Sequence, residues 1–257
     1  MDIKTLKEYC QMAASTAKDA VAAMLKDISR SKQVKLDKNR DVKIFADNKI
    51  ESFIIDRLLK YSRYSILSEE SGIIGQRKIN DNVIGYRWIV DPLDGTLNFL
   101  KGIPICCVSI ALWHGPNPLL GVVYDFNRNE LFKGIVGGGA WLNNRAIKVG
   151  VVSQRSKAII CTGFPVGTNF STDSIMKFVK TVQIYKKVRI IGSAALSLAY
   201  VSCGRVDCYW ENDIQIWDVA AGLSLVKAAG GSINFERSTL NNTMNAAAAN
   251  KLLIKDL

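Results

Sequence analysis

Two carboxylates stand three positions apart at the end of an apolar run, in the segment RWIVDPLDGTLNF, residues 87–99. Asp91 and Asp94 flank a proline, and Gly95 and Thr96 follow directly. Hard divalent cations prefer carboxylate oxygens, and the free N–H groups at the start of a helix can bind an anion. Capping a helix would need only one of these acids. We therefore expect this segment to bind a metal ion and a phosphate group together.

The elements around this segment must position those groups. We expect a strand over residues 83–90 that ends at Asp91, a turn fixed by Pro92, and a helix that opens at 94–96. Acids that could complete the site lie elsewhere in the chain. They are Asp47 in the first turn of a helix over 45–62, Glu69 and Glu70 at the end of a short strand, and Asp218 at the start of a helix near 217–229.

The rest of the pattern predicts a mixed α/β chain. Apolar residues at a spacing near 3.6 predict a helix over 3–28. Alternating segments at 106–114, 119–126 and 130–136 predict an antiparallel meander, and a hairpin follows. From about residue 150, strands and helices alternate, which favours α/β layers. We expect one compact unit with two lobes, an N-terminal α+β lobe (1–149) that holds most of the acids and a C-terminal α/β lobe (150–257).

Composition excludes several classes of protein. No apolar stretch approaches the roughly 20 residues that span a bilayer, and the charged N-terminal segment does not resemble a secretion signal, so we expect a cytoplasmic protein without a membrane partner. Six cysteines without a C-x-x-C pair predict buried free thiols. The net charge of +11 favours anionic partners, but no nucleic-acid-binding motif accompanies it. A solvated, lysine-rich surface is therefore the preferred interpretation.

Three motifs in this order resemble the signatures of the inositol monophosphatase family of magnesium-dependent, lithium-sensitive phosphatases. They are LSEESG (residues 67–72), WIVDPLDGTLNF (88–99) and WDVAAG followed by AGG (217–231). The resemblance implies a layered α-β-α-β-α sandwich and a homodimer. It also implies hydrolysis of a small phosphorylated polyol or sugar, such as inositol 1-phosphate, with two or three Mg²⁺ ions and a metal-activated water.

The resemblance also assigns roles to individual residues. It implies that one Mg²⁺ is held by Glu69, Asp91 and the backbone carbonyl of Leu93, and a second by Asp91, Asp94 and Asp218. Thr96, with Asp47 behind it, would orient the water on the first Mg²⁺, the ion that Glu69 helps to hold. The N–H groups of Gly95 and Thr96 would bind phosphate. The alcohol part of the substrate would contact Asp94, Gly192, Ser193, Ala194 and Glu211.

Four residues depart from the family's pattern. Leu97 replaces the usual second threonine after DGT, and Lys43 in DVKIFAD would place a cation near the metals or the phosphate. Asn212 and Asp213 follow Glu211 where small residues are usual. These departures leave the exact substrate and the number of metal ions open.

Other activities share parts of this pattern. Haloacid dehalogenase-like phosphatases use an aspartate nucleophile in DxDGT, but Asp91 and Asp94 are one position further apart than that motif requires. Within the family, nucleotide 3′-phosphatase, fructose-1,6-bisphosphatase and histidinol-phosphatase activities stay open. An added RNA- or transcription-associated role also stays open for a chain this basic.

Overall fold

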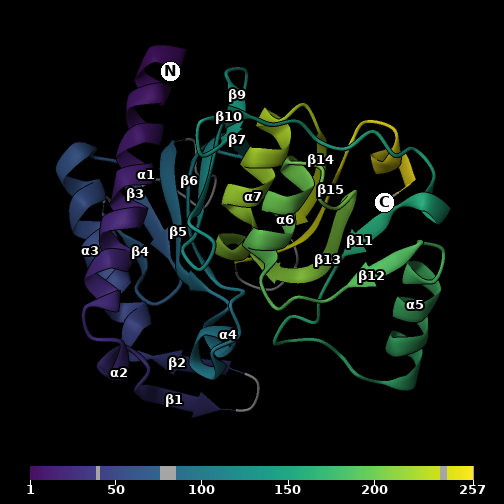
Figure 1. The fold of residues 1–257 in the computed structure, drawn as a ribbon, viewed down its shortest axis with the longest axis horizontal. Helices are drawn as coiled ribbons and strands as arrows, with labels where there is room; N and C mark the ends of the chain where they lie inside the picture. The colour runs from purple at the N-terminus through teal and green to yellow at the C-terminus, as the bar shows by residue number, and fades with distance from the viewer. Residues whose placement is uncertain (39–40, 76–84, 238–241, 257) are drawn as a thin grey trace.

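Helices and sheets alternate in five layers (Figure 1). α1 (Ile3–Leu25) and α3 (Phe45–Tyr61) cover one face of an eight-stranded sheet, and α6 (Ala194–Ser202) and α7 (Ile216–Ala228) lie on its other face. A five-stranded sheet and then α5 (Thr172–Val182) follow. The expected α-β-α-β-α sandwich is confirmed. The computed structural model describes residues 1–38, 41–75, 85–237 and 242–256.

The larger sheet is almost wholly antiparallel, and its strand order is β10-β9-β8-β7-β6-β5-β3-β4. Only β3 and β5 pair in parallel. The expected meander and hairpin are confirmed as β6 to β10. The strands are β3 (Ser65–Ser68), β4 (Gly72–Ile74), β5 (Tyr86–Asp94), β6 (Cys107–His114), β7 (Asn117–Asp125), β8 (Glu130–Ile135), β9 (Gly139–Leu142) and β10 (Arg145–Ala146). The strand expected over 83–90 begins two residues outside the described ranges.

The smaller sheet is mixed, in the order β12-β11-β13-β15-β14. β11 is parallel to β12 and β13, whereas β15 is antiparallel to both of its neighbours. The strands are β11 (Ile159–Cys161), β12 (Lys187–Arg189), β13 (Cys208–Gln215), β14 (Ser232–Arg237) and β15 (Thr243–Ala249). Sequence analysis missed β15, because its alanine run TMNAAAA has low strand propensity. Burial between two partner strands and under α7 overrides that propensity.

Short elements surround the lower end of the first sheet (Figure 1). The helix expected over 3–28 divides into α1 and a single turn, α2 (Ile28–Ser31). A hairpin of β1 (Val34–Lys38) and β2 (Asp41–Ile44) then leads into α3, and α4 (Thr96–Lys101) follows β5. Two 3₁₀ turns, η1 (Arg155–Lys157) and η2 (Leu253–Asp256), complete the described elements.

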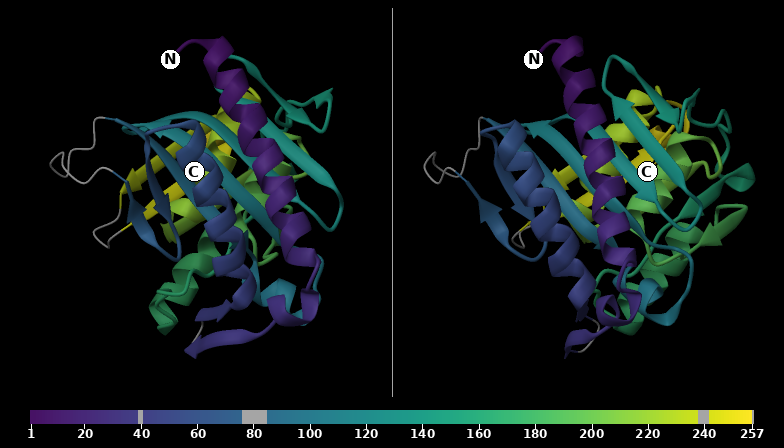
Figure 2. Two further views of the ribbon diagram at one scale, coloured as in Figure 1. Left: turned by 90° about the vertical axis from the view of Figure 1, so that its left-hand side faces the viewer. Right: turned by 60° about the vertical axis from the view of Figure 1, so that its left-hand side comes forward.

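Two large apolar cores, with a smaller one around β11, β13 and β15, hold the described layers together. One lies between the first sheet and the pair α1 and α3, which cross the sheet side by side (Figure 2). The other surrounds α6 and α7. α7 is apolar on nearly all sides, as expected for a helix enclosed between two sheets. Five of the six cysteines are buried and Cys203 is half-buried, all as free thiols. In the described ranges, every helix is too short or too polar to cross a bilayer.

Close approach of α7 to the first sheet depends on Gly121 in β7. A Cβ atom at this position would lie 2.2 Å from the carbonyl oxygen of Ala221 in α7. Backbone atoms cannot move aside as a flexible side chain can, so the helix and the sheet would have to separate.

We predict that Gly121→Ala lowers the free energy of unfolding by about 2 kcal/mol, the usual scale of core overpacking. Urea unfolding followed by circular dichroism measures the change. Gly167→Ala is the matched control, because no atom lies within 4 Å of the added Cβ. Equal stability of the two variants would contradict this account of the α7 contact.

Candidate active site

The two aspartates of the DPLD segment lie on one strand, on either side of a β-bulge. The expectation that the strand ends at Asp91 and turns at Pro92 is wrong, because β5 continues to Asp94. Asp91 pairs with Ser109 of β6. Asp94 pairs with Cys107, so two residues of β5 face one residue of β6. Side chains three apart on a regular strand point to opposite faces, and one inserted residue brings them to the same face. The bulge therefore lets both carboxyl groups share one site.

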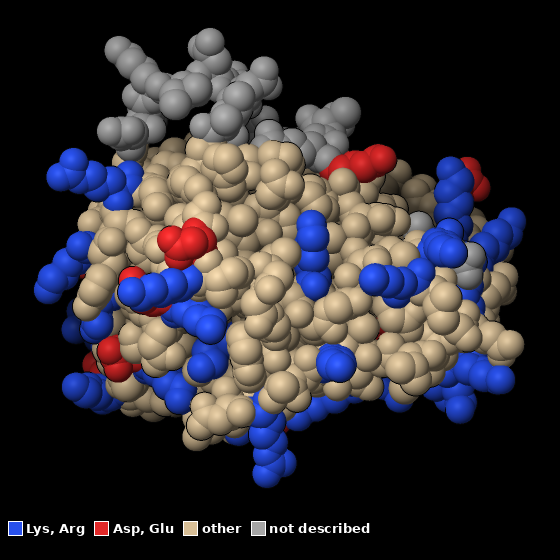
Figure 3. All heavy atoms as spheres, turned by 90° about the horizontal axis from the view of Figure 1, so that it is seen from above, with Lys and Arg blue, Asp and Glu red and all other residues tan. Residues whose placement is uncertain are grey.

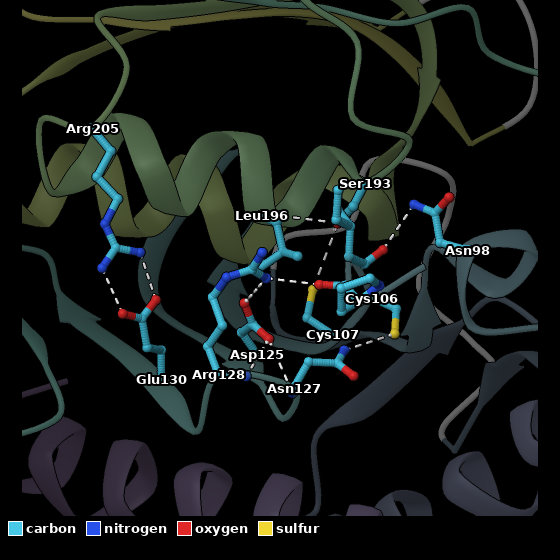
Figure 4. Close-up of polar contacts among 12 residues, drawn as sticks. Asn98, Cys106, Cys107, Asp125, Asn127, Arg128, Glu130, Ser193, Leu196 and Arg205 are labelled. Carbon is cyan, nitrogen blue, oxygen red and sulfur yellow. Dashed lines mark hydrogen bonds and ion pairs between the residues drawn. The ribbon is translucent and has the colours of Figure 1, made fainter. Parts of the chain in front are cut away.

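Asp94 connects the end of β5 to the start of α6. Its Oδ2 accepts hydrogen bonds from the Ser193 hydroxyl at 2.6 Å and from the Ala195 N–H at 2.7 Å. Ser193 is also the N-cap of α6 and accepts from the Leu196 N–H, and Figure 4 shows it beside Cys107. A carboxylate is favoured at a helix N-terminus by the helix dipole. The contact brings the predicted GSAA segment against the acidic pair.

Asp47 and Thr96 meet across the chain, as expected. α3 lacks a side-chain hydrogen bond from its N-cap residue, and Asp47 Oδ2 instead accepts from the Ile44 N–H at 2.7 Å. The Thr96 hydroxyl lies 2.9 Å from the Leu93 carbonyl oxygen and 3.5 Å from Asp47 Oδ1. The structure thus brings together the predicted hydroxyl, its carboxylate and the predicted carbonyl ligand.

The backbone conformation at position 95 requires a glycine. Its φ of +88° lies in the left-handed region, and a Cβ would stand 2.7 Å from the Ile105 carbonyl oxygen. A glycine would also allow close approach of a ligand, but the fold alone accounts for it. The N–H groups of Gly95 and Thr96 stand at the start of α4, where the first N–H groups of a helix have no partner within the helix.

The remaining predicted acids come from separate elements. Glu69 begins the turn after β3, and its N–H donates to the Val90 carbonyl at 3.3 Å, directly before Asp91. The carboxyl groups of Glu69 and Asp91 are within hydrogen-bonding reach of each other. Asp218 lies in the first turn of α7. Glu211 lies in β13 and is 7% exposed. Chain segments far apart in sequence therefore meet at one acidic cluster.

Burial and mutual repulsion dominate the electrostatics of this cluster. Burial, assisted by neighbouring carboxylates, raises the pKa of Glu69 to about 8 and drives the pKa values of Asp91 and Asp218 well above the usual range. Burial also raises the pKa of Glu211 to about 8 and that of Asp47 to about 7. For Asp94 the rise is to about 6, because the hydrogen bonds from α6 oppose the effect of burial. The cluster therefore lacks compensating positive charge.

Lys43 is the cation recorded beside the cluster in the described residues. Its Nζ lies 2.9 Å from Oε1 of Glu70, and its charge acts to lower the pKa of Asp47 and Glu69. Glu51 holds the same turn, because its Oε1 accepts from the N–H groups of Glu70 and Ser71. Lys43, one of the departures from the family's pattern, therefore lies at the edge of the acidic site.

The donor set fits a hard divalent cation. The groups that converge are carboxyl and carbonyl oxygens, and such a cation would relieve their repulsion. Buried oxygens without a hydrogen-bond partner in the described structure occur at Ser68, which precedes Glu69, at Ser109, which pairs with Asp91, and at Gln215, three residues before Asp218. Such atoms normally bond to water or an ion. No three acids in the described ranges form a closed coordination shell, and Oδ2 of Asp94 is engaged by α6, so binding would require the carboxylates to draw together.

Sequence analysis missed the residue that ties these loops together. Asn98 Nδ2 lies 2.8 Å from the Ile105 carbonyl oxygen, 3.0 Å from that of Ile191 and 3.3 Å from that of Gly192. Its side chain reaches from α4 toward the start of α6 (Figure 4). A planar amide just after the DGT segment was the available signal, but two of its three partners, Ile191 and Gly192, are over 90 residues away. Asn98 fixes the position of the glycine that precedes Ser193.

Comparison with known proteins agrees with this fold. The profile described as the inositol monophosphatase family matches residues 5–253. The structure is similar to that of inositol monophosphatase from Anabaena (Nostoc) sp., with a TM-score of 0.82, 36% identity and coverage of 98% of this chain and 94% of that one. This is the fold of a layered phosphatase family. The chain belongs to the inositol monophosphatase family.

Individual relatives carry two kinds of name. Inositol monophosphatase 3 of Solanum lycopersicum is 34% identical over 98% of this chain and 95% of its own length. The protein named Nus factor SuhB of Xylella fastidiosa is 42% identical over 73% of this chain. That alignment spans 66% of the Xylella protein, just under two thirds of its length.

We predict that the metal-free protein loses stability as the pH rises from about 5 to 8. In this window the folded chain holds protons on Glu69, Asp91 and Glu211 that the unfolded chain has released, so the free energy of unfolding falls with pH. The raised pKa values of Asp47, Asp94 and Asp218 act in the same direction. Melting curves in a chelator should show a decreasing Tm, and Asp91→Asn should flatten the decrease. A Tm that rises with pH would be inconsistent with the buried cluster.

We also predict that Lys43→Gln tightens Mg²⁺ binding, because the cluster loses its neighbouring positive charge and Glu70 loses its partner. Isothermal titration of the metal-free protein measures the dissociation constant without relying on activity. Lys35→Gln is the control, since Lys35 lies in the same hairpin and bonds to Asn48. Weaker Mg²⁺ binding in Lys43→Gln than in the control would disprove the electrostatic role.

Proposed function

We propose that the chain is a Mg²⁺-dependent phosphatase that hydrolyses a phosphate monoester, with inositol 1-phosphate or a related polyol or sugar phosphate as substrate. The convergence of Glu69, Asp91, Asp94 and Asp218 at the end of β5 is the observation that carries the proposal. Membership of the inositol monophosphatase family supports it, as do the names of the tomato and Anabaena proteins. A homodimer stays a prediction of the resemblance, and a cytoplasmic location stays a prediction from the composition and the N-terminal segment.

The acidic oxygens would hold two or three Mg²⁺ ions, with Glu69, Asp91 and the Leu93 carbonyl on one side and Asp91, Asp94 and Asp218 on the other. Such ions neutralise phosphate oxygens and lower the pKa of a water molecule, so that no protein nucleophile is needed. The chain's own contribution is to fix these oxygens. Leu93 is held by the bulge and by the hydrogen bond from Thr96, and Asp94 is held by α6.

Thr96 and Asp47 would position the attacking water. The Thr96 hydroxyl donates to the Leu93 carbonyl and lies close to Asp47, so its lone pairs are directed by two fixed neighbours. Glu69 would contact the same water from the opposite side. The N–H groups of Gly95 and Thr96 would bind phosphate oxygens, since both stand at the start of α4 next to Asp94.

The alcohol part of the substrate would lie between α6 and β13. Asp94 and the Gly192, Ser193 and Ala194 segment form one side through the hydrogen bonds at the start of α6. Glu211 faces them from the second sheet, where its carboxylate could accept hydroxyl hydrogen bonds. Leu97 lies in the first turn of α4 and is 52% exposed. Because leucine replaces the family's usual threonine here, an apolar surface lies at the edge of the site.

A transcription-associated role is the alternative that one relative's name, Nus factor SuhB, supports. The net charge of +11 is compatible with RNA binding. However, the lysine and arginine side chains in Figure 3 are scattered across that face and its margins, with other residues between them, and do not form one continuous patch. We therefore treat any such role as additional to catalysis.

We predict that phosphate release from inositol 1-phosphate requires Mg²⁺, stops with a chelator and is inhibited by lithium. Asp91→Asn should lower kcat/KM by at least about 100-fold, equivalent to about 2.7 kcal/mol, because it removes charge from both proposed metal positions. Asp19→Asn, at an exposed surface ion pair, should leave the rate unchanged. A phosphate-ester panel with matched melting curves provides the measurement, and activity that survives chelation would refute the metal-dependent mechanism.

A further inference from the structure

A cavity of about 330 Å³ lies between α1 and the strands β8 and β9 of the first sheet. In the sheet, β7 and β6 separate β8 from β5, which carries Asp91 and Asp94. In the described structure the lining of this cavity holds two lysines, three amide side chains and no carboxylate. Its volume is at the lower end of the range of pockets that bind small organic molecules. No role proposed above uses any of its residues.

Lys133 has an unusual position for a charged residue. It lies within β8 between Leu131 and Ile135, and alternate residues of a strand point to the same face of the sheet. Both neighbours are buried in the core beneath α1, so the Lys133 side chain also leaves the sheet on the side of α1. It is half-buried, and its ammonium group has no hydrogen bond or ion pair within the described ranges. A charge removed from water in this way is unfavourable without an anion beside it.

Lys7 brings a second positive charge to the same cavity. Lys7, Cys10 and Gln11 are three and four positions apart, so they share the face of α1 that lines the cavity. Burial raises the pKa of the Cys10 thiol to about 11, and the charge of Lys133 opposes that rise. Lys133 therefore acts across the gap between β8 and α1. Two ammonium groups at one cavity without an acid attract an anion.

Trp141 gives the cavity a flat wall. It pairs in register with Lys133 across β8 and β9, so the two side chains are neighbours on one face of the sheet. A Cβ atom at Gly139 would lie 3.3 Å from two carbon atoms of the indole, so the ring lies back along its own strand over the glycine. Trp141 is half-buried, which leaves part of the ring open to a ligand. An aromatic ring of this kind packs well against another flat ring.

We propose that this cavity binds a small organic anion, whose carboxylate or phosphate group lies between Lys7 and Lys133 and whose flat ring packs against Trp141. The anion would compensate the charge of both lysines. Gln11 and Asn144 line the cavity with amide groups that can donate hydrogen bonds to it. The proposal is independent of the phosphatase function, because none of the lining residues belongs to the acidic cluster.

Isothermal titration with phenylphosphonate and with benzoate tests the proposal, since these probes carry the same ring with a phosphate-like or a carboxylate group. A chelator keeps Mg²⁺ from the acidic site, whose carboxylates then repel anions. We expect at least one probe to bind, and the tighter one identifies the anionic group. Benzamide, which has the ring without the charge, should bind at least about tenfold more weakly, the scale of a hydrogen bond to a charged group.

Variants at the cavity separate charge from packing. Lys133→Met retains most of the side-chain length without the charge and should weaken binding of the anion by about tenfold or more. Lys133→Arg should retain binding, and Trp141→Leu should weaken it. Lys7→Gln, at an exposed position, tests the second charge without disturbing β8. Lys18→Gln is the matched control, because Lys18 is exposed about three turns further along α1 and lies over the Tyr124 ring.

Two results would overturn the proposal. One is that neither probe binds, or that the wild type binds benzamide as tightly as the anions. The other is unchanged affinity in both Lys133→Met and Lys7→Gln, with melting curves confirming that the variants are folded, because Lys133 would then only extend its charge into solvent. Binding that Asp91→Asn alters and Lys133→Met does not would place the probes in the acidic site, and would reject the cavity as well.

Discussion

Like charges buried together at the end of β5 are the constraint on which the rest of the structure depends. Carboxylates repel one another and lose hydration when buried, so a fold that brings several together must hold them by other contacts. In this chain, the conformation and the N–H groups of the backbone hold the carboxylates in place. The bulge in β5 orients Asp91 and Asp94, the N-terminus of α6 binds an oxygen of Asp94, and the first turn of α7 carries Asp218. The protein is therefore built to accept positive charge at this point.

The middle helical layer makes this arrangement possible. α6 and α7 pack on each other and on the first sheet, and their N-terminal ends carry Ser193 and Asp218. Small residues keep the layers close, since Gly222 of α7 would place a Cβ 2.3 Å from that of Leu198 in α6. Changes in this packing would move the two helix ends relative to β5. The packing of the core therefore determines the geometry of the site.

Much of this could be predicted from sequence because the signals were local. Helical periodicity located α1 and α3, alternation located β6 to β8, and the motifs named the acids that converge. The rest depended on partners distant in sequence. The extension of β5 through Pro92 depends on pairing with β6, and β15 forms because two strands enclose its alanines. The role of Asn98 depends on loops that no local pattern describes.

The left-handed backbone at Gly95 affects how the DGT motif should be interpreted in related chains. Any side chain at this position would strike the Ile105 carbonyl, whether or not the protein is an enzyme. A descendant that had lost catalysis would still need the glycine to fold, whereas repulsion among the buried carboxylates would favour replacement of the neighbouring acids. Retention of the glycine alone is thus uninformative about activity, and loss of Asp91 or Asp218 is the change that would mark a pseudoenzyme.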